Sequence, residues 1–323
     1  MRAARLHAYG PPDSLSIEEL PDPVPGPDEV LVDVVAAAVN YPDVLIMANR
    51  YQVSVPVPFT PGSEYAGVVR EVGRSVTGLA PGDHVFGSAM VGAFASCITV
   101  PAAHVKRIPP EVSLREASGF WVTYTTAFHA LRTVAEVSSG EWVAVLGAAG
   151  GVGLACVELA RLLGARVLAA ASTPAKLAVC AERGAEALVD YATDDLKVKM
   201  RDLTGGGADV VIDPVGGPYA EQALRSTRWG GRFVTVGFAS GEIPRIPLNL
   251  VLLKGVIVKG FEIRTFAEHL PEAARRNEAE LLSLFTRGRI HPHVSEVHPL
   301  ERVADALQSV AQRRAVGKVV VEP

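Results

Sequence analysis

The chain has 323 residues, of which 49% are apolar and 20% are charged, and its formal net charge at pH 7 is −4. This length exceeds one typical domain and suits two, and the composition is that of a globular enzyme rather than a disordered or fibrous chain. The acidic balance argues against general nucleic-acid binding, because phosphate backbones are bound by clustered positive charge. No apolar run reaches the about 18–20 residues that span a bilayer, and the first residues lack the apolar core of a secretion signal.

The cysteines indicate the redox environment. Cys97, Cys156 and Cys180 are odd in number and widely spaced, and the chain has no C-x-x-C motif. This pattern supports neither a disulfide framework nor a structural zinc cluster. We therefore predict a reducing, cytoplasmic location.

The first 120 residues read as short strands separated by Pro and Gly. Strands are predicted at 29–39, 64–73 and 83–88, with turns at 24–29 and 80–83. Short strands punctuated at this spacing predict a β-rich, barrel-like domain.

From 121 to 262 strands and helices alternate. Helices are predicted at 151–165 and 174–183, and strands at 142–147, 166–172, 186–191, 209–217, 231–238 and 255–262. These strands are rich in Val, Ile and Ala without polar alternation, as a parallel sheet covered on both faces requires. The pattern predicts a doubly wound α/β domain.

The remainder, 263–323, has helix-like runs around 268–287 and 300–314 and closes with the strand-like GKVVVEP. That terminal strand has no hairpin partner nearby. We therefore expect it to return to the first domain, which then consists of 1–120 and 263–323, with 121–262 as the dinucleotide-binding domain.

A glycine-rich turn lies between a predicted strand and a predicted helix. It contains Ala149, Gly150, Gly151, Val152 and Gly153. A glycine has no Cβ to keep the backbone away from a pyrophosphate, and the helix N-terminus presents N–H groups to the anion. In this context the turn predicts a dinucleotide site.

The end of the second strand of this domain bears on the choice of cofactor. An NAD site usually has Asp or Glu about 20 residues after the glycines, bonded to the ribose 2′-hydroxyl. Residues 171–176 contain no acid. Ser172 and Lys176 suit a 2′-phosphate instead, and Tyr191 completes the pocket, so NADPH is predicted; the alternative makes Lys176 a solvated helix residue.

Six landmarks in order carry a resemblance that covers essentially the whole chain: VNYPD (39–43), FTPGSEYAG (59–67), PGDHV (81–85), the turn at 147–153, DPVGG (213–217) and GKVV (317–320). The chain resembles the zeta-crystallin-like quinone oxidoreductases of the medium-chain dehydrogenase/reductase superfamily. The resemblance implies a GroES-like β-rich catalytic domain plus a Rossmann domain. It also implies a homodimer formed through Rossmann edge strands, with residues 256–261 as the edge.

The same resemblance bears on metal. Zinc-dependent relatives carry a Cys ligand near position 40 and a His just before Glu64, where this chain has Asn40 and Ser63. The lobe with four cysteines expected between 87 and 100 is missing. We therefore expect no metal site, and we interpret the HPH run at 291–293 as a surface turn.

The resemblance also implies the site residues. Asn40 and Thr126 are expected beside the nicotinamide, and Tyr51 at the substrate mouth, either as a hydrogen-bond or proton donor or as an apolar wall. The residues expected where loops cross the cofactor are Val215, Gly237, Phe238 and Lys318.

Without a metal to polarise a carbonyl, the acceptor must already take hydride well. We therefore predict an NADPH-dependent reductase of a quinone or related electron-poor carbonyl, with a small-molecule substrate and neither nucleic acid nor membrane as partner. Two alternatives stay open: an alkene reductase acting on enones or enoyl thioesters, and a non-catalytic NADPH-binding protein.

Overall fold

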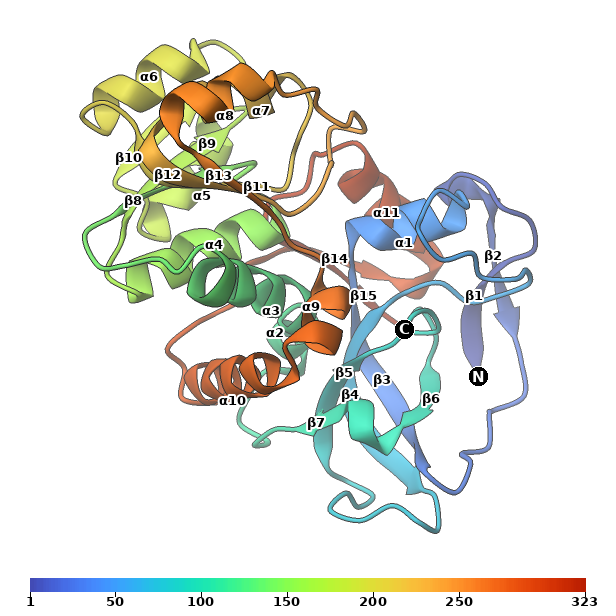
Figure 1. Ribbon diagram of the computed structural model, residues 1–323. Helices are drawn as coiled ribbons and strands as arrows, with labels where there is room; N and C mark the ends of the chain where they lie inside the picture. Colours follow the sequence, from blue (N-terminus) through green and yellow to red (C-terminus); the bar gives the residue numbers. More distant parts are fainter. The chain divides into compact units, whose positions relative to one another are not determined.

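The computed structural model describes residues 1–323, which divide into two compact units (Figure 1). The first unit consists of Met1–Val122 and His291–Pro323, and the second of Thr123–Ile290. The first unit is therefore discontinuous, as predicted, but residues 263–290 belong to the second unit and not to the first.

Two helices account for this correction, α9 (Ile263–His269) and α10 (Pro271–Thr286). Asn277 of α10 donates hydrogen bonds to Nδ1 of His129 at 3.0 Å and to the Thr133 hydroxyl at 2.8 Å. The Phe266 ring of α9 lies 4.5 Å from the His129 ring, centroid to centroid. Both helices are therefore held by the segment that opens the second unit.

The first unit is built on a β-sheet whose strand order is β14-β15-β3-β4-β5-β7, with β6 also paired to β3. The strands are β3 (Glu29–Val39), β4 (Glu64–Val72), β5 (His84–Ser88), β6 (Cys97–Pro101), β7 (Val105–Arg107), β14 (Val294–Pro299) and β15 (Lys318–Glu322); β1 (Arg2–Leu6) and β2 (Leu15–Glu19) form a separate pair. The C-terminal strand β15 pairs antiparallel with β3, which confirms that it returns to the first domain.

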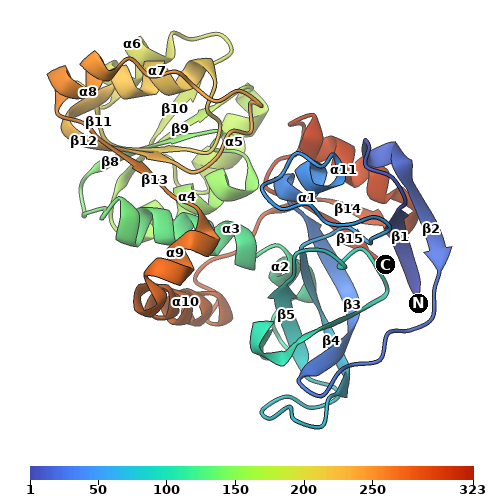
Figure 2. The same cartoon turned by 45° about the vertical axis from the view of Figure 1, so that its right-hand side comes forward.

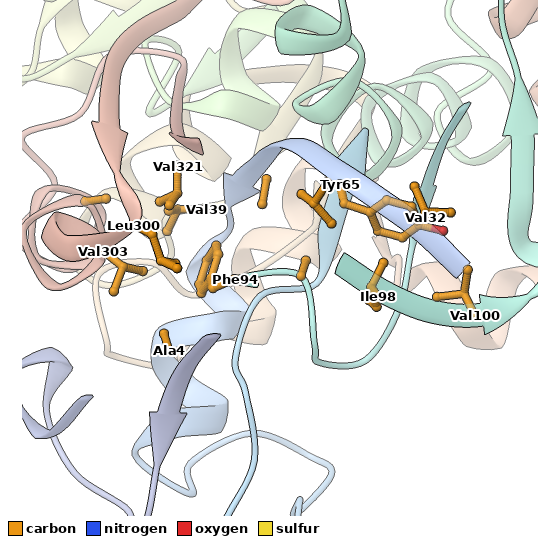
Figure 3. Packing of buried hydrophobic residues seen from close by; sticks show 14 of the residues in the cluster. Ala4, Val32, Val39, Tyr65, Phe94, Ile98, Val100, Leu300, Val303 and Val321 are labelled. Carbon is orange, nitrogen blue, oxygen red and sulfur yellow. The ribbon is translucent and has the colours of Figure 1, made fainter. Parts of the chain in front are cut away.

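Three helices accompany these strands: α1 (Tyr41–Met47), α2 (Leu114–Ser118) and α11 (Val303–Ala311), with short 3-10 turns at Pro12–Ser14, Ala102–His104 and Leu300–Arg302. Figure 3 shows the core of this unit, where Phe94 lies among Val39, Leu300, Val303 and Val321. These residues come from opposite ends of the chain. Their burial fixes β15 beside β3, because apolar area removed from water contributes roughly 25 cal/mol per Å².

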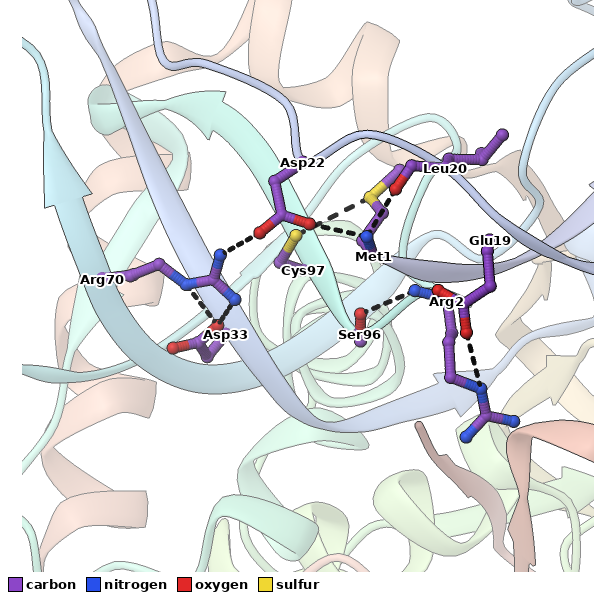
Figure 4. Close-up of polar contacts among 9 residues, drawn as sticks. All are labelled: Met1, Arg2, Glu19, Leu20, Asp22, Asp33, Arg70, Ser96 and Cys97. Carbon is purple, nitrogen blue, oxygen red and sulfur yellow. Dashed lines mark hydrogen bonds and ion pairs between the residues drawn. The ribbon is translucent and has the colours of Figure 1, made fainter.

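A polar network ties β4 to β3 at the surface of the first unit (Figure 4). Arg70 donates through Nε to Asp33 at 2.8 Å and through Nη1 to Asp22 at 2.6 Å. Since these side chains remain partly exposed, the pairs contribute little net stability, typically about 0–1 kcal/mol each.

The second unit has a six-stranded sheet in the order β10-β9-β8-β11-β12-β13, and every pairing is parallel. The strands are β8 (Trp142–Leu146), β9 (Arg166–Ala171), β10 (Ala187–Asp190), β11 (Ala208–Asp213), β12 (Thr227–Thr235) and β13 (Ile257–Gly260). Each falls within, or close to, a segment predicted as a strand. The doubly wound parallel sheet is therefore confirmed.

Helices cover both faces of this sheet (Figure 2). They are α3 (Trp121–His129), continued by a π-helical turn (Ala130–Val134), α4 (Gly151–Leu162), α5 (Pro174–Glu182), α6 (Leu196–Leu203), α7 (Pro218–Arg225) and α8 (Leu248–Lys254). Leucines of α6, α7 and α8 share one apolar cluster with the sheet, whereas α4 lies against the other face. None of the helices combines the length and apolar character needed to cross a membrane.

Candidate active site

The glycine-rich turn joins β8 to α4 at the carboxyl end of the parallel sheet. Gly147 has φ +56°, and a Cβ there would lie 2.7 Å from Cγ2 of Val215. A side chain at Gly147 would therefore be strained and would displace the loop after β11. The turn and that loop are packed together.

Two glycines of the turn have different surroundings. A Cβ on Gly153 would lie 2.3 Å from the Gly147 carbonyl oxygen and 2.7 Å from Ala148 backbone atoms, so only glycine lets α4 start this close to the turn. A Cβ on Gly150 would meet only the Gly147 carbonyl, at 3.4 Å. Gly150 is the N-cap of α4 and has no side chain to cap the helix. The first N–H groups of α4 are therefore available to an anion.

β8 and β11 are neighbours in the sheet, and the chain proceeds from them in opposite directions, to β9 and to β12. The carboxyl ends of two such strands form the usual ligand site of a doubly wound sheet. Here Asp213 closes β11, with Oδ1 accepting hydrogen bonds from the N–H groups of Val215 and Gly216, both at 2.8 Å. Burial raises the pKa of Asp213. Through the two hydrogen bonds to Val215 and Gly216, the Asp213 carboxyl group orients the loop.

The structure brings together the residues predicted to choose the cofactor. Lys176 Nζ lies 3.5 Å from the Ser172 hydroxyl at the end of β9. The Thr173 hydroxyl caps α5 by accepting from Lys176 N at 3.3 Å. Tyr191 N donates to the Ala171 carbonyl at 3.0 Å, and the Tyr191 ring lies 4.3 Å from that of Tyr219. Ser172, Lys176 and Tyr191 thus stand at the ends of the adjacent strands β9 and β10.

The loops after β11 and β12 carry the other residues predicted to contact the cofactor in the second unit. Val215 is buried against the glycine turn, whereas Phe238 is 38% exposed. Gly237 N contacts the Asp213 carbonyl at 3.4 Å. The three residues therefore belong to one loop cluster at the carboxyl edge of the sheet. Thr126 lies in the same unit, on α3.

In the first unit, Asn40 lies at the N-terminus of α1 within a buried polar cluster. Its Oδ1 accepts from Lys318 Nζ at 2.6 Å, and its Nδ2 donates to Glu64 Oε2 at 3.0 Å. Lys318 Nζ also lies 3.2 Å from Glu64 Oε2. Lys318, Glu64 and Asn40 are 3%, 0% and 5% exposed. Tyr51 lies elsewhere in this unit, partly buried against its core.

Sequence reasoning did not find the role of Glu64 and Asp43. In the sequence both residues stand out only as parts of landmarks, Glu64 in FTPGSEYAG and Asp43 in VNYPD. In the structure both are buried beside Asn40, and Asp43 Oδ2 accepts from Asn40 N at 2.7 Å. Burial raises the pKa of Asp43 to about 6. The available signal was the position of Glu64 at the start of a predicted strand. A charged residue buried in a strand needs a partner, because charged residues are seldom fully buried unless paired.

Comparison with known proteins identifies the family. Residues 26–110 match the family described as alcohol dehydrogenase GroES-like domain, and residues 151–279 the family described as zinc-binding dehydrogenase. Over 95% of its length the chain is 41% identical to quinone oxidoreductase-like protein 2 of Bos taurus, covering 88% of that protein. The chain belongs to the quinone oxidoreductase-like branch of the medium-chain dehydrogenase/reductase superfamily.

Solved structures agree with this assignment. The chain superimposes with a TM-score of 0.92 on the Escherichia coli quinone oxidoreductase in complex with NADPH, at 26% identity and with both chains fully covered. It matches a structure described as an NAD-dependent alcohol dehydrogenase equally well, with a TM-score of 0.92, 31% identity and full coverage of both chains. The first unit is therefore the GroES-like domain and the second the Rossmann domain of an oxidoreductase that uses a nicotinamide cofactor.

One of the two family descriptions names zinc, but the residues around Asn40 do not fit a zinc ion. Zinc needs three or four N, S or O ligands in close geometry. Here the Glu64 carboxylate is taken by the Lys318 ammonium, the Asn40 amide and, through Oε1, the Val122 N–H at 2.9 Å. A cation placed there would face the buried Lys318 ammonium, so these residues of the quinone oxidoreductase-like protein do not form a zinc site.

Proposed function

We propose that this chain is an NADPH-dependent reductase that transfers a hydride to a quinone or a related electron-poor carbonyl without a metal ion. The observation that carries the proposal is the end of β9. Lys176 and Ser172 meet there at 3.5 Å, and residues 171–176 contain no carboxylate. A cation and a hydroxyl in this position suit a 2′-phosphate, whereas an NAD site usually has an acid there.

The residues of the Rossmann domain have separate roles in this proposal. The N–H groups of Gly151, Val152 and Gly153 bind the pyrophosphate. Gly150, which has no Cβ, allows it to approach, and Ala149 precedes it in the same turn. Val215, Gly237 and Phe238 form the loops that cover the cofactor, and Tyr191 completes the 2′-phosphate pocket. When bound, NADPH supplies the hydride.

Around the reacting atoms, the proposed roles follow the family resemblance. Asn40 and Thr126 fix the face of the nicotinamide through hydrogen bonds, and Tyr51 lines the acceptor pocket or donates a proton to the developing oxyanion. Because the Glu64 carboxylate is already paired with Lys318, it does not hold a metal ion that would polarise the acceptor carbonyl. A quinone suits this site, since it accepts hydride without such activation.

The proposal is tested by NADPH oxidation with purified, chelator-treated protein, offered a quinone and a simple enone in parallel. We expect turnover of the quinone with NADPH and little with NADH. Turnover of the enone alone would make the chain an alkene reductase on the same scaffold. Tight NADPH binding without turnover of either acceptor would favour the non-catalytic NADPH-binding protein.

The cofactor preference has its own test in the pocket at the end of β9. Lys176→Met removes the proposed charge contact with the 2′-phosphate, and Ser172→Asp places an acid where NAD sites have one. We expect Lys176→Met to raise KM for NADPH by about 10- to 100-fold, since a charged hydrogen bond contributes about 1.5–3 kcal/mol, and to leave KM for NADH nearly unchanged. Equal effects on both cofactors would contradict the assignment of Lys176, and Ser172→Asp is expected to favour NADH.

We also propose that the protein forms a homodimer through the outer strand of the Rossmann sheet. β13 stands at the edge of the six-stranded sheet, and Ile257 and Val258 on it are 49% and 43% exposed. An edge strand with exposed apolar side chains is a template for pairing with another chain.

A cytoplasmic location stays a prediction, supported by three free and buried cysteines.

A further inference from the structure

The buried cluster around Asn40 has a role that the family roles above do not include. We propose that Lys318 and Glu64 are positioning residues that hold the Asn40 side chain in one orientation, so that Asn40 acts as a hydrogen-bond donor. This inference rests on the proposed function, in which Asn40 contacts the nicotinamide. It assigns Lys318 a positioning role, in place of the direct cofactor contact expected from the sequence.

The chemistry of the two neighbours determines the orientation of the amide. A lysine ammonium carries only donors and an ionised carboxylate only acceptors. Asn40 Oδ1 faces Lys318 Nζ at 2.6 Å, and Asn40 Nδ2 faces Glu64 Oε2 at 3.0 Å. If the amide were flipped, its N–H₂ group would face the ammonium and its oxygen would face the carboxylate. Both contacts would then be repulsive, so a single orientation is stable.

The rest of the cluster keeps these two neighbours in place. Lys318 Nζ also donates to the Val39 carbonyl at 3.3 Å and contacts Glu64 Oε2 at 3.2 Å. Glu64 Oε1 accepts from Val122 N at 2.9 Å. The ammonium therefore has three acceptors and the carboxylate three donors. Because Lys318 and Glu64 are 3% and 0% exposed, water does not compete for these bonds and they are electrostatically stronger than at the surface.

The backbone also makes room for the Lys318 stem. A Cβ on Gly119 would lie 3.0 Å from Lys318 Cγ, 3.2 Å from Cε and 3.3 Å from Cβ. Such distances are shorter than ordinary van der Waals contact, so any larger residue at 119 would press on three carbons of the lysine. Gly119 follows α2, and the lysine stem passes over it to reach Asn40. Side-chain size at position 119 is thus coupled to the position of the ammonium.

The orientation decides what Asn40 offers to a ligand. One Nδ2 hydrogen is directed to Glu64, and the other makes only a 3.4 Å contact with the Ser63 hydroxyl. That contact is long for a hydrogen bond, so a bound ligand can accept this hydrogen at little cost. Asn40 therefore presents a donor of fixed direction, as the preorganisation of a hydride-transfer site requires.

A double-mutant cycle tests the proposal through the single-turnover rate of NADPH oxidation with a quinone. The proteins are wild type, Asn40→Ala, Lys318→Met and Asn40→Ala/Lys318→Met. We expect Lys318→Met to lower the rate by about 10- to 100-fold, as misplacement of a positioning group does. In the Asn40→Ala background we expect Lys318→Met to cause no further loss of rate. We expect Lys318→Met to lower thermal stability in both backgrounds. Additive losses of rate would overturn the proposal, because Lys318 would then act independently of Asn40.

Two further measurements keep the test decisive. Lys318→Met leaves the Glu64 charge buried and unpaired, so Glu64→Gln/Lys318→Met serves as the charge-balanced variant and is expected to show the same pattern. In the ligand-free wild-type protein, the side-chain ¹⁵N–¹H signals of Asn40, identified by their absence in Asn40→Ala, should exchange slowly with water. We expect faster exchange in the charge-balanced variant, and unchanged exchange would overturn the proposal. This signal needs no turnover, so it decides the positioning role even if the wild type fails to reduce a quinone.

Discussion

Asp43 is a carboxyl group enclosed at the start of α1. It is 1% exposed, Oδ2 accepts from Asn40 N at 2.7 Å, and Oδ1 is buried without a hydrogen-bond partner. Burial raises its pKa from 3.8 to about 6. The ionised form is therefore held in the folded protein at a cost in free energy.

This cost predicts a pH dependence of stability with a definite sign. Between pH 3.8 and about 6 the folded protein binds more protons at Asp43 than the unfolded chain does, so the contribution of Asp43 to stability falls as pH rises through that window. Two pKa units correspond to about 3 kcal/mol. We expect Asp43→Asn, which removes the charge and keeps an acceptor, to gain up to that amount relative to wild type between pH 4 and 7.

Urea unfolding of both proteins at several pH values between 4 and 7 measures this gain. The comparison at pH 4 is the internal control, because the carboxyl group and the amide are then both neutral in the folded state. Unfolding free energies that run parallel across the range would show that burial does not raise the pKa of Asp43 in the folded protein.

The sequence identifies Asn40 through a local landmark but not the residues that hold it. Glu64 is 24 positions away and Lys318 is 278 positions away. Their meeting depends on β3, β4 and β15 lying side by side, and no local pattern encodes that pairing. By contrast, Ser172 and Lys176 are four positions apart on one strand–helix junction. Their contact follows from local geometry and could be predicted.

The turn between β8 and α4 contains two glycines with different roles. Gly153 is needed for packing, and Gly150 is proposed to make room for a ligand. We expect Gly153→Ala to destabilise the second unit by about 1–3 kcal/mol, because its Cβ would lie 2.3 Å from the Gly147 carbonyl oxygen. Gly150→Ala is the matched control. Its Cβ would meet only one atom, at 3.4 Å, and φ is −78°, so stability should change by less than about 1 kcal/mol.

NADPH binding discriminates the two variants further. If the pyrophosphate lies against Gly150, the added methyl group should raise the NADPH Kd by about 10-fold or more, equivalent to about 1.4 kcal/mol. Thermal unfolding and fluorescence titration measure the two effects. If Gly150→Ala bound NADPH with the same Kd as the wild type, the pyrophosphate could not lie against Gly150 in this turn.

The elements of the parallel sheet could be predicted because each strand is buried on both faces and therefore reads as an apolar run. The run at 142–147 became β8, at 142–146, and the run at 209–217 became β11, at 208–213. Helix α10 could also be predicted approximately, from the helix-like run around 268–287, whereas α9 and the surface that both helices cover were not predicted. That surface is formed by His129 and Thr133, more than 130 residues earlier in the chain.

The domain boundary was predicted wrongly because the sequence indicates where a helix forms but not which surface it covers. An amphipathic helix shows that one of its faces is buried but not against which partner. Residues 263–290 adjoin the predicted C-terminal return to the first unit, yet their contacts with His129 place them in the second. The terminal strand β15 was predicted in the correct unit. A strand has unpaired N–H and C=O groups along its edges, so it is expected to pair with a sheet.

The apolar surface beside β13 argues for a second copy of the chain as its partner. Leu252, Leu253 and Trp229 are 81%, 71% and 78% exposed. The two leucines lie near the end of α8, shortly before β13 in the chain, and a Cβ on the intervening Gly255 would lie 3.5 Å from the Trp229 ring. Apolar side chains gathered at one place on a protein surface mark an interaction site more often than scattered ones do. We expect the wild-type protein to sediment near twice its chain mass of 34.1 kDa.

Val258→Lys places a charge on the β13 edge, where lysine is a common means of preventing strand pairing. We expect this variant to sediment as a monomer with an unchanged circular dichroism spectrum. Leu188→Lys is the matched control, since Leu188 is 38% exposed on β10, the strand at the opposite edge of the same sheet. If Leu188→Lys gave the monomer and Val258→Lys the dimer, the interface would lie at β10. If both remained dimeric, neither sheet edge would form it, and the exposed side chains of β13 would need another explanation.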